Sequence, residues 1–121
     1  MPTRYKFKTE NSSDNRITES KRICTKYKDR VPIIVEVYDR DKDRLTLDKS
    51  KFLVPFDLTV GQFIYVIRKR IILNADEAIF IFINDLLVPN SQCMGNVYKE
   101  YKDKDGFLYS MISLESTFGS N

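Results

Sequence analysis

The pattern of hydrophobic and polar residues along the chain predicts four β-strands. Runs rich in β-branched and aromatic residues are typical of strands, and strict alternation indicates a strand with two unlike faces. The strand-like segments are residues 31–38, 51–56, 78–84 and 107–115. Segment 78–84 is apolar almost throughout, which predicts a strand buried on both faces. Pro55 places the end of the second strand at a sheet edge or beyond its ladder.

Three further segments, before and between these strands, have the signals of helices. They are residues 11–27, 59–71 and 91–103. The first begins with capping residues and is basic, which is typical of an exposed helix. In the second, Thr59 and Gln62 have the spacing of a capping box, in which each side chain accepts a hydrogen bond from a free backbone N–H of the first turn.

The order of these elements predicts an α+β fold. Two adjacent strands with a short connection favour a hairpin, and a crossover helix followed by a returning strand favours a mixed sheet. The predicted layout is therefore the ubiquitin-like β-grasp, a four-stranded mixed sheet crossed by one main helix. In this layout the last strand, 107–115, lies in the middle of the sheet and leads into the C-terminal tail.

Segment 59–71 carries more apolar residues than one buried helix face requires. Phe63 and Val66 lie off the stripe that is predicted to pack on the sheet, which consists of Val60, Ile64, Ile67 and Ile71. Because one stripe is enough to seat a helix on a sheet, we expect the surplus to form a second buried face or to line a ligand site. Strand 51–56 alternates in a similar way, with Phe52 and Leu53 pointing to opposite faces.

Length and charge limit the classes of protein that fit. With 121 residues, 42% of them hydrophobic, the chain suits a single compact domain. The formal net charge of +3 is too small to indicate a nucleic-acid binder by itself. Residues 1–30 nevertheless hold nine Lys and Arg against four Asp and Glu. We therefore divide the chain into a basic helical segment 1–30, a core 31–117 and a tail 118–121.

Cysteine and targeting signals are sparse. Cys24 and Cys93 form no CxxC pair, and the chain has no histidine, which argues against a zinc site. A disulfide between the two cysteines stays open. The N-terminus has no apolar core of a signal peptide, and the apolar stretch 78–88, interrupted by Asn84 and Asp85, is far shorter than the roughly 20 residues that span a bilayer. We expect a soluble, cytosolic protein whose membrane contact is acquired.

Known catalytic arrangements do not appear in the sequence. There is no histidine for general base catalysis, no GxSxG and no glycine-rich phosphate loop. Asp103 and Asp105 precede Gly106 and are interpreted as part of a loop rather than as a catalytic pair. We expect neither an enzyme nor a bound cofactor.

Four stretches of the chain together resemble one family closely. They are "KYKDRVPIIVE", "LVPFDLTVGQFIYVIRKRI", "LLVPNSQCMGNVYKEYKDKDGFLY" and "ESTFG". The chain resembles the autophagy ubiquitin-like modifiers, the family of the GABA type A receptor-associated protein and the light-chain modifiers of microtubule-associated proteins. The resemblance runs from Tyr27 to Gly119 and implies additional N-terminal helices beside the β-grasp core.

The resemblance implies that the tail is a substrate. A cysteine protease would cut after Gly119, and activating and conjugating enzymes would join Gly119 to phosphatidylethanolamine on autophagosomes and cytoplasmic vesicles. A residue without a Cβ can lie extended in a narrow enzyme channel. Arg68 and Phe118 would help the processing enzymes to hold the tail. The residues alone also fit an ordinary frayed terminus and, around Arg68, the solvated end of a helix.

The resemblance also implies a groove for cargo receptors that carry an aromatic-x-x-aliphatic motif. The motif would add a strand beside residues 50–54 and fill two pockets. The pocket between sheet and central helix would be lined by Phe52, Val54, Pro55, Leu58, Phe63 and Val66. The pocket between sheet and N-terminal helices would be lined by Glu19, Ile23, Pro32, Ile34, Lys51, Leu53 and Phe107. Lys49 and Arg70 would complete the site.

Two simpler interpretations stay open. Phe52 and Phe63 could be ordinary core residues, with the edge lysines protecting the strand from aggregation. The whole chain could also be an unconjugated binding module that uses residues 1–30, with aromatic Tyr5, Phe7 and Tyr27 among the cations, to hold acidic tubulin tails or nucleic acid. Beside the enzymes of the conjugation pathway, we keep tubulin as a candidate partner, and we do not expect nucleic acid.

Overall fold

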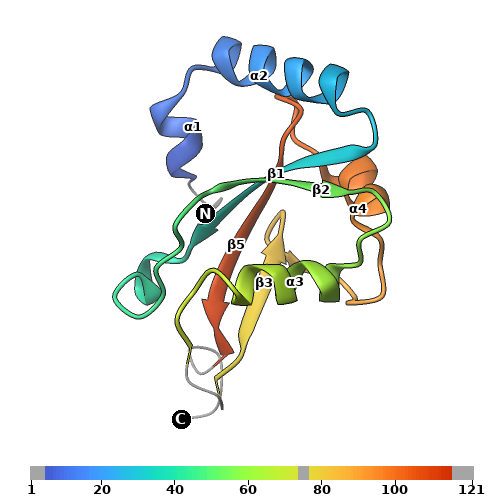
Figure 1. Cartoon of the computed structure of the whole chain (residues 1–121). Coiled ribbons are helices and arrows are strands. Elements are labelled where there is room, and N and C mark those ends of the chain that lie inside the picture. Colours follow the sequence, from blue (N-terminus) through green and yellow to red (C-terminus); the bar gives the residue numbers. More distant parts are fainter. Residues whose placement is uncertain (1–4, 74–76, 116–121) are drawn as a thin grey trace.

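The computed structural model describes residues 5–73 and 77–115. Within them, one mixed sheet separates two pairs of helices (Figure 1). Its strands are β1 (Arg30–Val37), β2 (Lys51–Pro55), β3 (Ile79–Ile83), β4 (Leu86–Leu87) and β5 (Leu108–Leu114). The helices are α1 (Lys6–Glu10), α2 (Ser13–Lys26), α3 (Val60–Arg68) and α4 (Met94–Tyr101), with a 3-10 turn at Asp39–Asp41.

The strand order confirms the predicted α+β topology but adds a strand. The order is β2-β1-β5-β3-β4, with β1 antiparallel to β2 and parallel to β5. The last long strand thus lies in the middle of the sheet. The predicted count of four strands is wrong, because the chain turns at Asn84 and Asp85 and pairs Leu86 and Leu87 back onto β3. Both turn residues have positive φ, 52° and 65°, as the tightest hairpin turns require.

Each face of the sheet has its own hydrophobic core, because side chains alternate along the strands. The core under α3 and α4 includes Ile33, Phe52, Phe63, Ile67, Met94, Val97, Leu108 and Ile112. The core under α1 and α2 consists of Tyr5, Ile23, Ile34, Phe107, Tyr109 and Met111. β5 contributes to both cores, with Leu108 and Ile112 in the first and Tyr109 and Met111 in the second.

The prediction that segment 78–84 is buried on both faces is wrong. Ile79, Ile81 and Ile83 are buried, but Phe80 and Phe82 are only half-buried. On this second face Phe82 packs edge-on against Tyr38, with ring centroids 5.7 Å apart. β3 therefore has one fully covered face and one partly open face.

A buried carboxylate joins α2 to the turn before β5. Asp105 accepts a hydrogen bond from Arg16 Nη1 at 2.6 Å and another from the Tyr109 hydroxyl. Burial and the bond donated to Asp105 both raise the pKa of Tyr109. Gly106 has φ of +92°, and a Cβ there would lie 2.9 Å from the Cβ of Ser20. Asp103, Asp105 and Gly106 thus lie in a loop before β5, as predicted.

Cys24 and Cys93 are both free thiols, which answers the open question of a disulfide. Cys24 Sγ lies 3.7 Å from the hydroxyl of Tyr98 on α4. Across the described ranges, none of the helices combines the length and apolar character needed to cross a bilayer.

Candidate functional site

β2 is an edge strand whose outer backbone groups face away from β1. Val35 N–H donates to the Ser50 carbonyl at 2.7 Å, and the same register pairs Ile33 with Phe52. In an antiparallel pair only alternate residues bond to the partner strand. The N–H and C=O groups of Lys51 and Leu53 therefore point outward along the edge.

The side chains of β2 divide between the two faces of the sheet. Phe52 and Val54 are buried, with exposed fractions of 3% and 5%, in the core under α3 and α4. Lys51 and Leu53 are half-buried on the opposite face, where Leu53 packs against the other core. The predicted opposition of Phe52 and Leu53 is therefore present in the structure.

Of the residues expected between the sheet and the central helix, Phe52, Val54, Leu58 and Phe63 pack in one core, in a closed arrangement. Phe52 and Phe63 meet edge-on with their ring centroids 5.7 Å apart, and Phe63 is fully buried. Around this pair, Val54 is buried, Leu58 and Val66 are half-buried and Pro55 is exposed.

Three of the four residues predicted for the buried stripe, Val60, Ile67 and Ile71, are buried in the core under α3 and α4. Val60, Phe63 and Ile67 form the buried face of α3, while Ile64 is only half-buried. Ile71 lies beyond Arg68, where the helix ends. Both stripes have helical spacing, so the sequence did not decide between Phe63 and Ile64. The ring of Phe52 below the helix selects Phe63.

The residues expected between the sheet and the N-terminal helices surround the other face of β2. Ile23, Pro32, Ile34 and Phe107 are buried, and Glu19, Lys51 and Leu53 are half-buried. Glu19 on α2 forms an ion pair with Lys51 on β2. This pair spans the surface between the helix and the edge strand.

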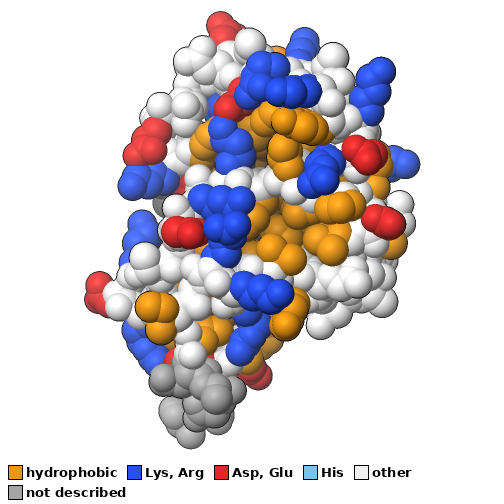
Figure 2. Space-filling model, viewed as in Figure 1, with side chains coloured by type: hydrophobic (Ala, Val, Ile, Leu, Met, Phe, Trp, Pro, Cys, Tyr) orange, Lys and Arg blue, Asp and Glu red, His pale blue; other side chains and the backbone are white. Residues whose placement is uncertain are grey.

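Cations lie along the same edge. Lys49 Nζ lies 4.7 Å from the centroid of the Phe52 ring. Arg70 Nη1 lies 3.3 Å from the carboxylate of Asp48, just before β2. Figure 2 shows hydrophobic side chains exposed across the face that carries β2 and α3, with Lys and Arg side chains beside them.

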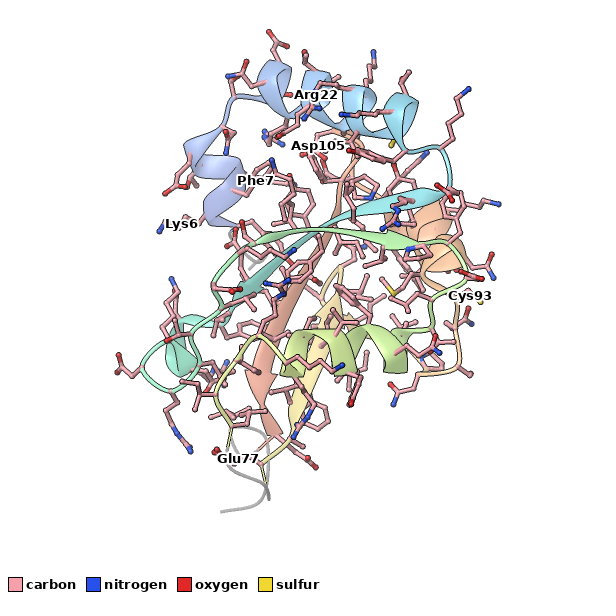
Figure 3. All side chains as sticks on the ribbon, in the orientation of Figure 1. Lys6, Phe7, Arg22, Glu77, Cys93 and Asp105 are labelled. Atoms are coloured by element: carbon pink, nitrogen blue, oxygen red, sulfur yellow. The ribbon has the colours of Figure 1, made fainter. Side chains whose placement is uncertain are left out.

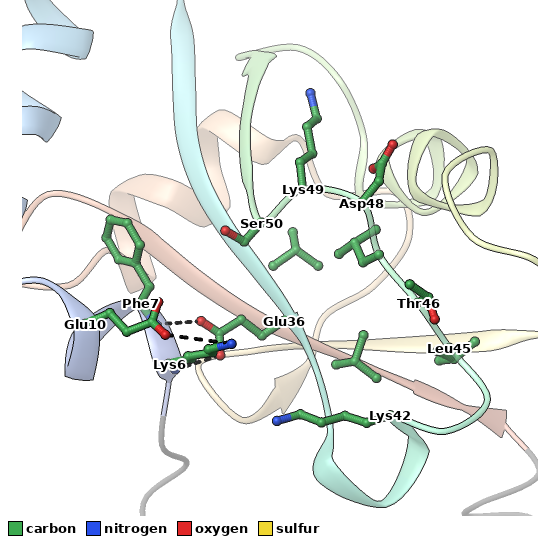
Figure 4. Close-up of a pocket in the computed structure, with 13 residues that line it drawn as sticks. Lys6, Phe7, Glu10, Glu36, Lys42, Leu45, Thr46, Asp48, Lys49 and Ser50 are labelled. Carbon is green, nitrogen blue, oxygen red and sulfur yellow. Dashed lines mark hydrogen bonds and ion pairs between the residues drawn. The ribbon is translucent and has the colours of Figure 1, made fainter.

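A cavity of about 540 Å³ adjoins the start of β2 (Figure 4). Val35, Val37 and Leu47 give it an apolar part, and charged side chains of both signs surround it. Its lining is Lys6, Phe7, Glu10, Val35, Glu36, Val37, Lys42, Leu45, Thr46, Leu47, Asp48, Lys49 and Ser50. Of the peptide-site residues expected from the sequence, Lys49 alone belongs to this lining, so the cavity extends the expected site.

Glu36 is the residue of this cavity that sequence reasoning missed most clearly. Its two carboxylate oxygens accept hydrogen bonds from the backbone N–H groups of Lys6 and Phe7, each at 2.8 Å. Tyr5 provides no side-chain cap for α1, so Glu36 supplies that cap from the sheet. The sequence did contain one signal. Glu36 is an acidic residue on the same strand face as buried Ile34, and a charged side chain in such a position needs a partner.

A second group of residues surrounds the end of β5. Glu115 N–H donates to the Ala78 carbonyl at 2.9 Å. Arg68 Nη1 donates to the Glu77 carbonyl at 3.1 Å, and Arg44 pairs with the Glu77 carboxylate. Figure 3 labels Glu77 at this end of the molecule. Arg68 thus lies beside the root of the tail.

The other two residues of the expected tail site, Phe118 and Gly119, lie outside the described residues.

Known proteins resemble this chain over nearly its whole length. The family model described as "Autophagy protein Atg8 ubiquitin like" matches residues 15–119. Autophagy-related protein 8 of Emericella nidulans is 53% identical over 116 residues, which cover 96% of this chain and 98% of that protein. Its Neurospora crassa counterpart is 53% identical over 116 residues, with 96% and 95% covered.

A solved structure agrees with the sequence comparison. The crystal structure of Trypanosoma brucei ATG8 matches with a TM-score of 0.88 and 42% sequence identity, covering 97% of this chain and all of that one (100%). The resemblance seen in the sequence is thereby confirmed, together with the ubiquitin-like fold. The chain belongs to the Atg8 family of ubiquitin-like autophagy modifiers.

Proposed function

We propose that the chain is cut after Gly119 and joined through this residue to phosphatidylethanolamine on autophagosomes and cytoplasmic vesicles. The observation that carries the proposal is the extent of the family match, which runs to residue 119 and leaves Ser120 and Asn121 outside it. The position of Arg68, hydrogen-bonded to Glu77 beside the end of β5, supports a role in presenting the tail.

The chemistry requires little of the modifier itself. A cysteine protease hydrolyses the bond between Gly119 and Ser120, and an activating enzyme adenylates the new carboxylate with release of pyrophosphate. An enzyme thiol then displaces the adenylate, and the lipid amine displaces the thiol to form an amide. Each attack takes place at the Gly119 carbonyl, so a residue without a Cβ leaves the carbonyl accessible in a narrow channel.

We further propose that β2 receives the peptide motif of cargo receptors. The outward N–H and C=O groups of Lys51 and Leu53 can bond to an added strand. In an extended peptide, residues i and i+3 point to opposite faces. An aromatic-x-x-aliphatic motif therefore sends its two anchors to the two faces that Phe52 and Leu53 separate.

The two faces are not equally open. Phe52 and Phe63 fill the interior beneath α3, so an anchor on that side contacts half-buried Leu58 and Val66 or separates the two rings. On the other face Leu53 is half-buried beside the pair of Glu19 and Lys51. Side chains contribute most to binding where water is excluded, so we assign the larger share of affinity to the face of Leu53.

Residues that flank the motif would reach the cavity beside β2. A strand that continues past Lys51 toward Lys49 arrives at its opening. Lys6 and Lys42 lie on the lining together with Lys49. Such exposed cations favour acidic flanking residues, and they act more on association rate and specificity than on affinity.

Gly119→Ala tests the attachment. We expect this variant to fold normally and to stay out of the membrane pellet, whereas Ser120→Ala, changed on the other side of the cut, should be converted like the unmodified chain. The measurement is cell fractionation followed by gel mobility. Normal conversion of Gly119→Ala to a membrane-bound form would refute the proposed attachment.

The alternative module for tubulin or nucleic acid receives less support. Tyr5 is 7% exposed and packs against Tyr109, so its ring is not available for stacking. Phe7 packs edge-on against Phe107 at 5.1 Å. Exposed cations of α2 remain, and Tyr27 is 37% exposed. The other two aromatic rings of that hypothesis, however, pack in the core.

A further inference from the structure

Ile72 is an aliphatic side chain with almost no cover. Its exposed fraction is 91%, whereas that of its neighbour Ile71 is 8%. A single exposed apolar residue needs no explanation by itself. Its surroundings make Ile72 informative, because it lies in the connection between α3 and β3, which runs beside the end of β5 in Figure 1.

The surroundings form what we call the exit face, defined by Arg44, Arg68, Ile72, Glu77 and Ala78. Two hydrogen bonds hold it to the end of the sheet, from Arg68 to the Glu77 carbonyl and from Glu115 to the Ala78 carbonyl. The last strand therefore leaves the domain at this face.

The length of the tail limits how far this face can be from an anchored lipid. Four residues lead from Glu115 to Gly119. An extended chain covers at most about 3.6 Å per residue, so the tail reaches no more than about 14 Å in any conformation. If Gly119 is joined to phosphatidylethanolamine, as proposed above, the exit face is held at the depth of the lipid headgroups or just above it.

The charges of the exit face suit an anionic or zwitterionic surface. The side chain of Arg44 is 54% exposed, whereas that of its partner Glu77 is 18% exposed, so the cation is presented outward. Lys69 next to Arg68 is also exposed. Glu115 is also exposed, and its negative charge opposes the charges of these cations. The electrostatic attraction to the membrane is therefore modest, and the apolar contact of Ile72 sets the depth of the domain.

We propose that the conjugated domain rests on the bilayer with its exit face, and that Ile72 inserts between the headgroups while Arg44 and Arg68 contact lipid phosphates. This inference rests on the proposed attachment at Gly119. The other candidate occupant of the same face is a processing enzyme, which would also approach the root of the tail.

The chain offers a clean reporter for the test, because it contains no tryptophan. Ile72→Trp introduces a single indole at an exposed position. The matched control is Tyr27→Trp, which replaces a 37% exposed aromatic side chain at the C-terminal end of α2. Figure 1 shows that end of α2 on the opposite side of the sheet from α3.

Both variants, ending at Gly119, are coupled chemically to phosphatidylethanolamine in vesicles of phosphatidylcholine and phosphatidylserine with brominated acyl chains. We expect the emission of coupled Ile72→Trp to shift to the blue and to be quenched by bromine. The emission of coupled Tyr27→Trp should match that of the uncoupled protein. Coupling by chemistry separates this test from enzymatic attachment, so the failure of one is not the failure of the other.

Two outcomes would overturn the inference. Unchanged emission from coupled Ile72→Trp would place Ile72 in water. Quenching of Tyr27→Trp without quenching of Ile72→Trp would place another face on the membrane. If, in addition, Ile72→Trp slowed enzymatic cleavage of the full chain, the residue would belong to the contact with the processing enzyme.

Discussion

Lys51 on the edge strand and Glu19 on α2 form an ion pair across the face where we place one anchor of the peptide motif. Their side chains are 38% and 27% exposed, so the pair is only partly screened by water. The same lysine lies 5.9 Å from the centroid of the Phe7 ring on α1. Lys51 therefore joins both N-terminal helices to the strand that would receive a peptide.

Glu19→Gln should release Lys51 for an incoming acid at little cost to the fold. Partly exposed pairs contribute about 1 kcal/mol or less, so we expect the free energy of unfolding to change by no more than this. Affinity for a motif peptide with an acidic residue before the aromatic should rise, and Lys51→Ala should lower it. Calorimetric titration at low and high salt measures both. Weaker binding by Glu19→Gln would show that the pair helps to form the pocket.

Leu53→Ala and Phe52→Ala should separate binding from stability. Leu53 is half-buried, so its truncation should cost about 1–3 kcal/mol of binding free energy and less stability than a core change. Phe52 is 3% exposed, and its truncation leaves a core cavity that costs about 3–5 kcal/mol of stability. Titration calorimetry and thermal unfolding on the same samples make the comparison. If the folded Leu53→Ala variant bound the motif peptide as tightly as wild type, β2 would not be the binding site.

The sequence predicted best the features that depend on local chemistry. The capping box of Thr59 and Gln62 is present with both hydrogen bonds. That box requires only neighbours in the sequence. The place of β5 in the middle of the sheet is a long-range feature, and it was predicted from the order of the elements and the β-grasp layout that this order favours.

Features that depend on tertiary packing were harder to predict. The helical period fits Phe63 and Ile64 equally well, and contact with Phe52 decides between them. β4 consists of two exposed leucines, too short for a pattern, although Asn84 and Asp85 are typical of a tight turn. The pairing of Glu36 with α1 links residues about 30 positions apart, which no local pattern reveals.

Glu36→Gln should loosen α1 without disturbing the sheet. An amide side chain can accept only one of the two hydrogen bonds that the carboxylate receives from Lys6 and Phe7. Losing such a bond costs about 1 kcal/mol, so amide exchange at these residues should quicken about fivefold. Glu10→Gln is the control, because Glu10 is exposed and pairs along α1 with Lys6. Equal exchange in wild type and Glu36→Gln would contradict the capping role.

Acid should weaken the contact of α1 with the turn before β5. Burial alone would raise the pKa of Asp103, but hydrogen bonds from Lys8 and from the Asp105 backbone, with the charges of Lys8 and Arg16, lower that pKa below its usual range. A lowered pKa in the folded state stabilises the fold above the ordinary value of about 4, and this contribution is lost as the pH falls below it.

Asp103→Asn provides the comparison for this pH effect. Below about pH 4, NMR signals of α1 should change with pH more in the wild-type chain than in Asp103→Asn. The difference isolates this group from the other carboxylates that titrate in the same range. The same pH dependence in both proteins would contradict the assigned role of the pair formed by Lys8 and Asp103.

Mass spectrometry of the C-terminus from cells in which autophagy is induced tests the central claim most directly. The account predicts a membrane-bound form whose chain stops at Gly119 and carries the mass of phosphatidylethanolamine, beside a soluble form with a free Gly119 carboxylate. A population that retains Ser120 and Asn121 under these conditions, with no lipid on Gly119, would contradict it.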